Sequence, residues 1–201
     1  MNLGIALGAL TIAFMLLYIR PLSYDITGLS ATEIGLIFLF SFVAVVTGFL
    51  MHEIAHKIVA VRYGLWAEFR ASMRGLVIAI VTALFGIVLA APGAVMISGP
   101  ISQRMNGVIS AAGPLTNLAF GGGFFALFLA FIFIPISAPF FLLVLFYQII
   151  QVNLILGAFN MIPIPPLDGS KVWRWKKELW IGLFGILLGL LVSFYALFYL
   201  T

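Results

Sequence analysis

The 201-residue sequence contains no cysteine, only two histidines and few charged residues, and each shortage restricts what the chain can be. Without cysteine there is no disulfide and no thiolate ligand, so any metal ion must be held by histidine, carboxylate or water. Charged residues make up 8% of the chain and hydrophobic residues 64%, with a mean hydropathy of +1.26. A soluble globular domain of this size does not have this composition. We predict a multi-pass protein of the cell membrane.

The net charge of +4 is small and comes from ten Lys and Arg residues against six acidic ones. Membrane topology explains such an excess better than nucleic-acid binding does. No polar segment combines a run of basic residues with interleaved stacking aromatics, so we expect no nucleic-acid partner. The twenty phenylalanines suit contacts with lipid and between helices. The predicted surroundings are the lipid bilayer.

Five apolar segments are long enough, or nearly so, to cross a bilayer, which takes about 20 residues. They cover residues 3–19, 34–61, 108–134, 140–159 and 179–200. A sixth segment, 76–91, is shorter and ends at a Pro-Gly pair. No basic residue precedes the first segment, so we interpret it as a retained helix and not a removable signal peptide. The expected fold is an all-α polytopic membrane protein, a single domain over 1–201 with about five to six transmembrane helices.

Four connecting segments are predicted to be non-helical. Residues 67–70 and the β-branched run 92–100, which Gly and Pro bracket, favour a small membrane-associated β element, and 102–107 suggests a surface turn. Residues 161–169 contain three prolines, which remove hydrogen-bond donors and force extended geometry on the residues before them. Broken backbone at membrane depth is tolerated only where it lines a cavity or is buried in protein. We therefore expect 160–169 to form part of a functional site.

The other part of that site is the segment His52-Glu53-Ile54-Ala55-His56, which lies inside an apolar span. On a helix, two histidines four residues apart lie on one face about 5–6 Å apart and can chelate one metal ion. Glu53 then lies beside whatever the metal binds and can move a proton between water and a leaving amine. Charged groups inside a bilayer cost roughly 2.5–3.5 kcal/mol each, which argues against a merely structural role.

A catalytic zinc site usually has three protein ligands and an open position, so a third ligand is needed. Asp25, Glu33 and Glu178 lie at loop or helix ends, and Glu68 lies in a surface loop only twelve residues after the second histidine. Asp168, on the broken segment, fits best.

Three asparagines lie in the apolar spans or at their ends. Asn117 can serve as an interhelical hydrogen-bonding group or support a metal ligand, and the sequence leaves both roles open. Asn153, Gly157 and Asn160 follow helical spacing and share one face.

Three motifs follow one another along residues 52–169. They are His52-Glu53-x-x-His56, Ala112-Gly113-Pro114-x-x-Asn117 and Asn160-x-x-Pro163-x-Pro165-Pro166-Leu167-Asp168-Gly169. Together they resemble the site-2 protease family of intramembrane zinc metalloproteases, peptidase family M50. The resemblance implies a three-helix catalytic core, at about 34–170 in this chain. Ser170 stands where many relatives have a second glycine, and the PDZ or CBS domain that many carry is not found in these residues, so regulation by such a domain is not inferred.

The resemblance also implies the roles of individual residues. One Zn²⁺ ion per chain would be held by His52, His56 and Asp168, with Glu53 as the base. Asn160 matches a family asparagine that helps to hold the substrate carbonyl or its oxyanion, which agrees with the need for a donor near developing charge. The implied activity is hydrolysis of peptide bonds within or near transmembrane segments of membrane-bound substrates, including regulators of transcription and signal-peptide remnants, as in regulated intramembrane proteolysis.

Two other functions compete with this interpretation. A metal transporter or channel needs metal-binding groups along a path across the bilayer, and often internal repeats, whereas this sequence has one polar cluster and no repeat. An inactive membrane scaffold would typically have lost the base, but Glu53 is present. We therefore expect a zinc metalloendopeptidase.

The basic residues predict the topology. If 76–99 dips into the membrane and returns, Arg20 lies on one face and eight basic residues lie on the other, namely Arg62, Arg70, Arg74, Arg104, Lys171, Arg174, Lys176 and Lys177. If 76–91 crosses fully, the eight are divided between the two faces. The positive-inside tendency favours the re-entrant arrangement. We predict a cytoplasmic N-terminus, an external C-terminus and an active site within the bilayer, nearer the cytoplasmic face.

Overall fold

The computed structural model describes residues 3–19, 29–86, 88, 93–134 and 139–199. The helices are α1 (Leu3–Ile19), α2 (Ala31–Val45), α3 (Met51–Arg62), α4 (Met73–Ala83), α5 (Gln103–Phe133), α6 (Phe140–Asn160), α7 (Asp168–Trp175) and α8 (Lys177–Tyr199). A π-helical turn, η3 (Val46–Leu50), joins α2 to α3. The strands are β1 (Trp66–Ala71) and β2 (Gly93–Ser98).

Among the described residues, four helical stretches are long and apolar enough to cross a membrane. They are Ala31–Arg62, Gln103–Phe133, Phe140–Asn160 and Lys177–Leu197. The apolar helices α1 and α4 are shorter, with 17 and 11 residues. The helical fold and the small β element agree with the sequence prediction, but four described stretches have membrane-spanning length where about five to six transmembrane helices were predicted, because α1 and α4 are shorter.

The long helical rod that carries the His-Glu-x-x-His motif begins with a capping box. Ser30 Oγ accepts a hydrogen bond from the Glu33 backbone N–H, and the Glu33 side chain accepts one from the Ser30 backbone N–H. These bonds satisfy two backbone groups at the helix start. Near the middle of the rod, η3 contains one more residue per turn than an α-helix would, so it changes the face on which every later side chain lies.

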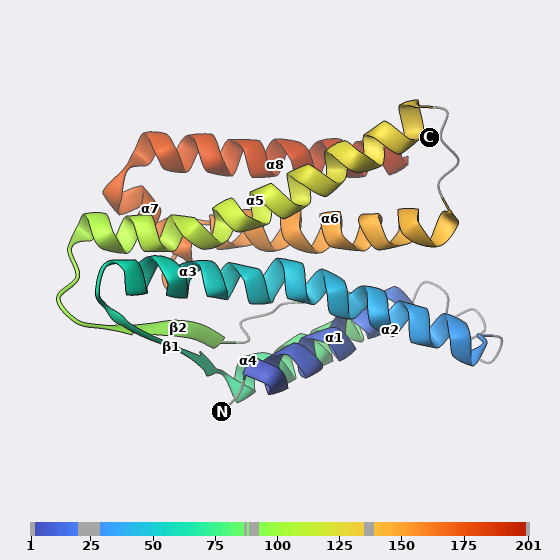
Figure 1. The fold of residues 1–201 in the computed structure, drawn as a ribbon, viewed down its shortest axis with the longest axis horizontal. Helices are drawn as coiled ribbons and strands as arrows, with labels where there is room; N and C mark the ends of the chain where they lie inside the picture. The colour runs from blue at the N-terminus through green and yellow to red at the C-terminus, as the bar shows by residue number, and fades with distance from the viewer. Residues whose placement is uncertain (1–2, 20–28, 87, 89–92, 135–138, 200–201) are drawn as a thin grey trace.

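The α2–η3–α3 rod lies between two groups of helices, with α5, α6 and α8 on one side and α1 and α4 on the other (Figure 1). One apolar core joins α1 and α4 to the rod and to α6, and a second lies among α5, α6, α7 and α8. Small residues allow close packing where α5, α6 and α8 meet, because a β-carbon on Gly157 would lie 2.9 Å from Leu187 Cδ2 and 3.0 Å from Asn117 Cβ. The helices are therefore held close together at the level of Asn117.

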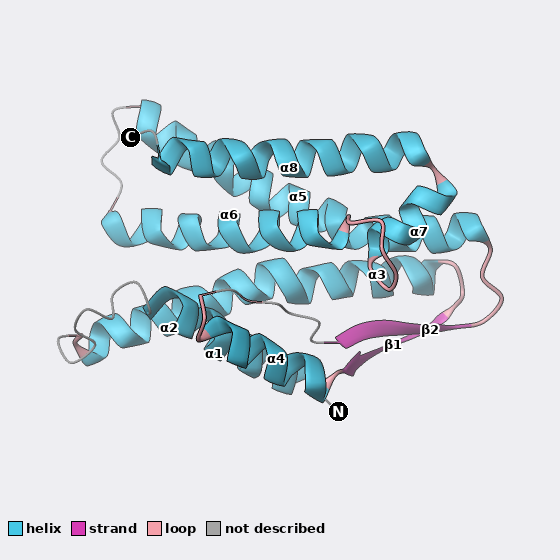
Figure 2. Ribbon diagram, turned by 180° about the vertical axis from the view of Figure 1, so that it is seen from behind, coloured by secondary structure: helices cyan, strands magenta, loops and turns pink. Residues whose placement is uncertain are grey.

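The two strands pair antiparallel although α4 separates them in the sequence (Figure 2). Trp66 pairs with Ser98 at one end, and Ala71 pairs with Gly93 at the other. Because Ala71 and Gly93 are partners, the chain that leaves β1 through α4 returns to the place where it left. The observed β1 covers the predicted segment 67–70, and β2 lies within the predicted segment 92–100.

Two connecting regions differ from the prediction. Residues 102–107 do not form a surface turn, because Ser102 caps α5 by accepting a hydrogen bond from the Met105 backbone N–H at 3.2 Å, and the helix begins at Gln103. Residues 168 and 169, which were predicted to belong to the broken segment, instead begin the short helix α7, because no proline follows Pro166 to prevent it. Residues 161–167 between α6 and α7 are non-helical, as their prolines predicted.

Candidate metal centre and catalytic cavity

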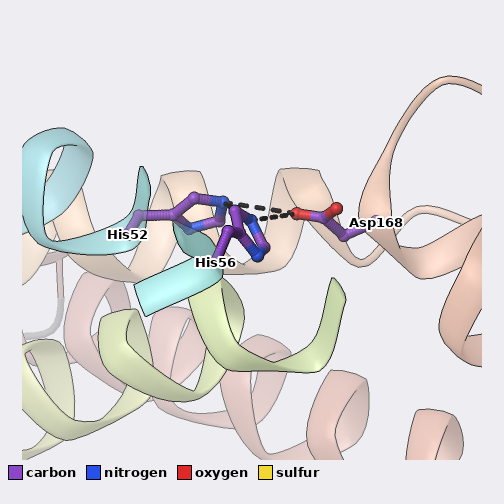
Figure 3. Close-up of side chains that lie close together, drawn as sticks. All are labelled: His52, His56 and Asp168. Carbon is purple, nitrogen blue, oxygen red and sulfur yellow. Dashed lines mark hydrogen bonds and ion pairs between the residues drawn. The ribbon is translucent and has the colours of Figure 1, made fainter. Parts of the chain in front are cut away.

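Three side chains that the sequence singled out converge at one point. His52 and His56 project from α3, and Asp168 is the first residue of α7 (Figure 3). The Nε2 atoms of the two histidines are 3.0 Å apart. Asp168 Oδ2 lies 3.3 Å from His52 Nε2 and 3.0 Å from His56 Nε2. The three atoms form a nearly equilateral triangle.

This triangle fits a metal ion in both size and chemistry. Ligands held tetrahedrally at 2.0–2.1 Å from one ion are about 3.3 Å from each other, close to the separations found here. The side chains are buried, with relative exposures of 4%, 7% and 8% for His52, His56 and Asp168. Two imidazole nitrogens and one carboxylate oxygen are a donor set that zinc accepts. Among the described residues these three form a group that could hold a metal ion.

Asp168 is charged in this environment. Burial raises the pKa of its carboxyl, but the charge of His56 and the hydrogen bonds from both imidazoles outweigh burial and bring the pKa well below its usual range. The carboxylate is therefore available as an anionic ligand.

Hydrogen bonds at Nδ1 fix the orientation of both imidazoles. His56 Nδ1 lies 2.7 Å from the Ile109 carbonyl oxygen, and His52 Nδ1 lies 2.6 Å from Asn117 Oδ1. Both partners are acceptors, so each ring donates from Nδ1, and this bond holds Nε2 facing Asp168. The sequence left the role of Asn117 open, and the structure shows it both bridging helices and orienting a candidate ligand.

A buried network in turn fixes Asn117. Its Nδ2 donates to the Gly48 carbonyl oxygen at 2.7 Å and to Asn153 Oδ1 at 3.1 Å. The Nδ2 of Asn153 donates to Thr47 Oγ1 at 3.1 Å. Thr47 and Gly48 belong to η3, so this π-helical turn and α6 together hold the amide that orients His52. Sequence reasoning missed the roles of Thr47 and Asn153; their only signal was polarity within apolar spans.

Asn117→Ala is expected to weaken metal binding without removing a ligand. Loss of a hydrogen-bond partner behind a metal-ligating histidine typically costs 10-fold to 100-fold in affinity, so we expect a loss of about that size for zinc. Competition with a zinc chelator measures it. Thr116→Ala is the matched control, because the Thr116 hydroxyl donates to the Ala112 carbonyl oxygen of its own helix. Equal zinc affinities in the two variants would contradict this role for Asn117.

Gly113 forms the wall of α5 behind the centre. A β-carbon at this position would lie 2.5 Å from His52 Nε2 and 2.6 Å from His56 Nε2. Real β-carbons do not come this close to other atoms, so only glycine allows α5 to pass directly beside the ligand nitrogens. This contact explains the glycine of the Ala112-Gly113-Pro114 motif.

A cavity of about 160 Å³ opens on the three side chains, and Glu53 and Asn160 line it with them. The Glu53 carboxylate has a hydrogen bond from the Val95 backbone in β2, and its Oε2 is buried without a hydrogen-bond partner among the described residues. Asn160 Nδ2 donates to the Leu156 carbonyl oxygen at 2.9 Å. The structure thus brings all five predicted site residues to one cavity.

The other carboxylates weighed as third ligands lie elsewhere. Glu33 is engaged in the capping box of α2, Glu68 pairs with Arg70 at 3.6 Å on β1, and Glu178 lies in the first turn of α8. Asp25 lies outside the described residues. Of the carboxylates that the structure describes, Asp168 is the one grouped with both histidines.

Curated proteins match this chain over most of its length. It is 44% identical over 147 residues to "Putative zinc metalloprotease MJ0611" of Methanocaldococcus jannaschii, covering 72% of this chain and 74% of that protein. The chain belongs to the site-2 protease family.

Other matches agree with membership of the site-2 protease family. "Putative zinc metalloprotease YwhC" of Bacillus subtilis is 34% identical over 151 residues, or 65% of each chain. "Putative zinc metalloprotease Rip3" of Mycobacterium tuberculosis is 31% identical over 139 residues. That match covers 68% of this chain but only 31% of Rip3, so the chain spans about a third of that relative. No protein-family model and no solved structure matches the chain significantly.

Proposed function

We propose that this member of the site-2 protease family is an intramembrane zinc metalloendopeptidase with one zinc ion per chain. The observation that carries the proposal is the buried triangle of His52, His56 and Asp168 with the Glu53 carboxylate in the same cavity. The relatives' names, which specify zinc metalloproteases, support it. The ligands would be the two histidines and the aspartate.

Each of the site residues in the cavity has a separate proposed role in peptide hydrolysis. Zinc held by the triangle would polarise the scissile carbonyl and acidify a water molecule. Glu53 takes the proton of that water and returns it to the leaving amine nitrogen. Asn160 lines the α6 side of the cavity, and its proposed role is to donate its amide to the developing oxyanion.

The location of the triangle favours substrates that are themselves in the membrane. His52 and His56 belong to a 32-residue apolar stretch, Ala31–Arg62. From His52 to Arg62 the helix rises about 15 Å, so we propose that the centre lies inside the hydrocarbon region but nearer the end marked by Arg62. The proposed substrates are transmembrane segments and signal-peptide remnants.

Purified protein in detergent tests the proposed function directly. It should cleave members of a panel of single-span substrates, and a zinc chelator should stop the cleavage. The competing metal transporter predicts metal uptake into vesicles that contain the protein, with no cleavage of any substrate. Metal uptake without cleavage of any substrate would contradict the protease function and favour the transporter function.

Helix-breaking residues should make poor substrates better ones. A helical peptide bond is shielded by its own hydrogen bonds, so the substrate must be extended at the cavity. Residues of β2 line this cavity, and β1 occupies only one edge of β2 in the described sheet, which leaves the other as a template for an extended chain. Gly or Pro introduced beside the scissile bond should raise the rate measured by gel. If several substrates respond to sequence swaps but not to helix breakers, unwinding is not required.

We propose that α4 is re-entrant and, from the positive-inside tendency, that the N-terminus lies in the cytoplasm. At 11 residues and about 16 Å, α4 is too short to cross the bilayer, and the pairing of Ala71 with Gly93 returns the chain to its starting side. Single cysteines at Arg70 and Ser102 should both be protected from an impermeant thiol reagent on intact cells. Labelling at Ser102 with protection at Arg70 would mean that the segment spans. Arg20, the predicted external charge, lies outside the described residues.

A further inference from the structure

A second cavity, of about 360 Å³, lies between the start of α5 and α7. We call it the basic pocket, and its lining consists of Ile101, Ser102, Gln103, Asn106, Lys171 and Arg174. Asn106 and Lys171 also line the catalytic cavity. The basic pocket therefore adjoins the catalytic cavity and shares a wall with it.

Contacts between α5 and α7 hold the basic pocket in shape. The Gln103 side-chain amide donates to the Arg174 carbonyl oxygen. One turn along α5, a β-carbon on Gly107 would collide with the side chain of Trp175, so glycine lets the Trp175 side chain pack directly against the α5 backbone. The pocket is thus fixed relative to Asp168, because Asp168 is the first residue of α7.

The chemistry of the lining suits a carboxylate. It offers two cations, two amides and one hydroxyl, and no acidic side chain lines it. The Lys171 ammonium lies 3.3 Å from Asp168 Oδ1, while Asp168 Oδ2 faces the histidines. Arg174 is exposed to the pocket side of α7 and carries the second positive charge. An anion in this pocket would gain the attraction of both.

We propose that the basic pocket is a substrate subsite that binds an acidic side chain two to four residues from the scissile bond. The proposal rests on the proposed peptidase function. Lys171 and Arg174 follow Asp168 by three and six residues, or about 4.5 and 9 Å along the helix axis. An extended peptide advances about 3.3 Å per residue, and its side chain adds further reach, which gives the range of two to four.

The shared wall favours a peptide over a lipid headgroup as the occupant. A chain extended through the catalytic cavity past Asn106 and Lys171 enters the basic pocket directly. An anionic lipid would need only the surface charge, and that charge extends beyond the pocket to exposed Arg104 and Lys176. The two occupants therefore differ in which basic residues should matter.

Charge reversal at Arg174 tests the subsite. Substrates carry Glu, Gln or Lys at each position from two to four residues on either side of the scissile bond. Wild-type protein should prefer Glu over Gln at one of these positions by about fivefold in kcat/KM, as expected for a pair worth about 1 kcal/mol. Arg174→Glu should reverse the preference to Lys. Lys176→Glu, the same charge change on an exposed residue outside the pocket, should keep the preference for Glu.

A binding measurement separates this inference from the peptidase function. Fluorescence anisotropy of the same peptides on a Glu53→Gln background reports the charge preference without turnover. If wild-type protein cleaves nothing, the proposed function fails, and the binding preference still decides the subsite. If cleavage occurs but Arg174→Glu and Lys176→Glu behave alike, the subsite is wrong. A charge effect that appears only in vesicles with anionic lipid, and not in neutral ones, would assign the pocket to lipid and overturn the proposal.

Discussion

Glu53→Gln will retain zinc and lose peptide hydrolysis. Glutamine has the size of glutamate but cannot take a proton from water, and loss of a general base typically lowers kcat by about 10²–10⁴-fold. The ligand atoms belong to His52, His56 and Asp168, so the metal remains. Turnover of a single-span substrate and zinc content measured on the same preparation check both parts.

The control for Glu53→Gln is the same substitution at Glu68. Glu68 lies on β1, where it pairs with Arg70, and is not grouped with the histidines. Glu68→Gln should therefore leave the turnover of the single-span substrate at the wild-type level. Full proteolysis by Glu53→Gln would remove Glu53 from the mechanism, and loss of its zinc would show that the carboxylate supports the metal instead.

Substitution of a metal ligand is expected to lower both zinc affinity and substrate turnover by a large factor. His56→Ala or Asp168→Ala removes one vertex of the triangle, so zinc affinity should fall by more than the 10-fold to 100-fold typical of changes behind a ligand. Because bound metal stabilises the folded protein, added zinc should raise the Tm of wild-type protein and not that of these variants. Zinc content, Tm and cleavage are the three measurements.

The double variant of His56 and Asp168 gives the sharpest form of this test. It should have no specific zinc, and its Tm should match that of chelator-treated wild-type protein. Full zinc occupancy in the double variant would show that the metal lies elsewhere in the chain.

Local patterns in the sequence were enough to predict most of what the site contains. The four-residue spacing of His52 and His56 determines that they share a face of α3. Hydropathy predicted α1 with its observed bounds and α6 to within one residue, because both helices are continuous apolar runs. The prolines of 161–167 ended α6 and so placed Asp168 at the start of a new element.

Features that depend on tertiary contacts could not be predicted. The π-helical turn η3 has no sequence signature of its own, and its role becomes clear only when Asn117 is seen bonded to the Gly48 carbonyl. The pairing of β1 with β2 joins residues on either side of α4, which local propensity does not reveal. The Ser102 cap, in contrast, was a readable signal, since serine before a helix is a common N-cap.

The requirement for glycine at position 113 is explained by the structure and not by the sequence motif alone. The resemblance to the site-2 protease family drew attention to this glycine, but sequence alone offered only the general statement that glycine permits close approach. The structure shows what approaches Gly113 so closely: the Nε2 atoms of His52 and His56, which face Asp168.

The most direct test of a zinc centre that hydrolyses peptides is to remove and restore zinc while following cleavage of one single-span substrate. We predict one zinc per chain in active protein, no cleavage after chelation, and recovery in proportion to zinc returned up to one equivalent. Cleavage that continues in zinc-free protein would contradict the account.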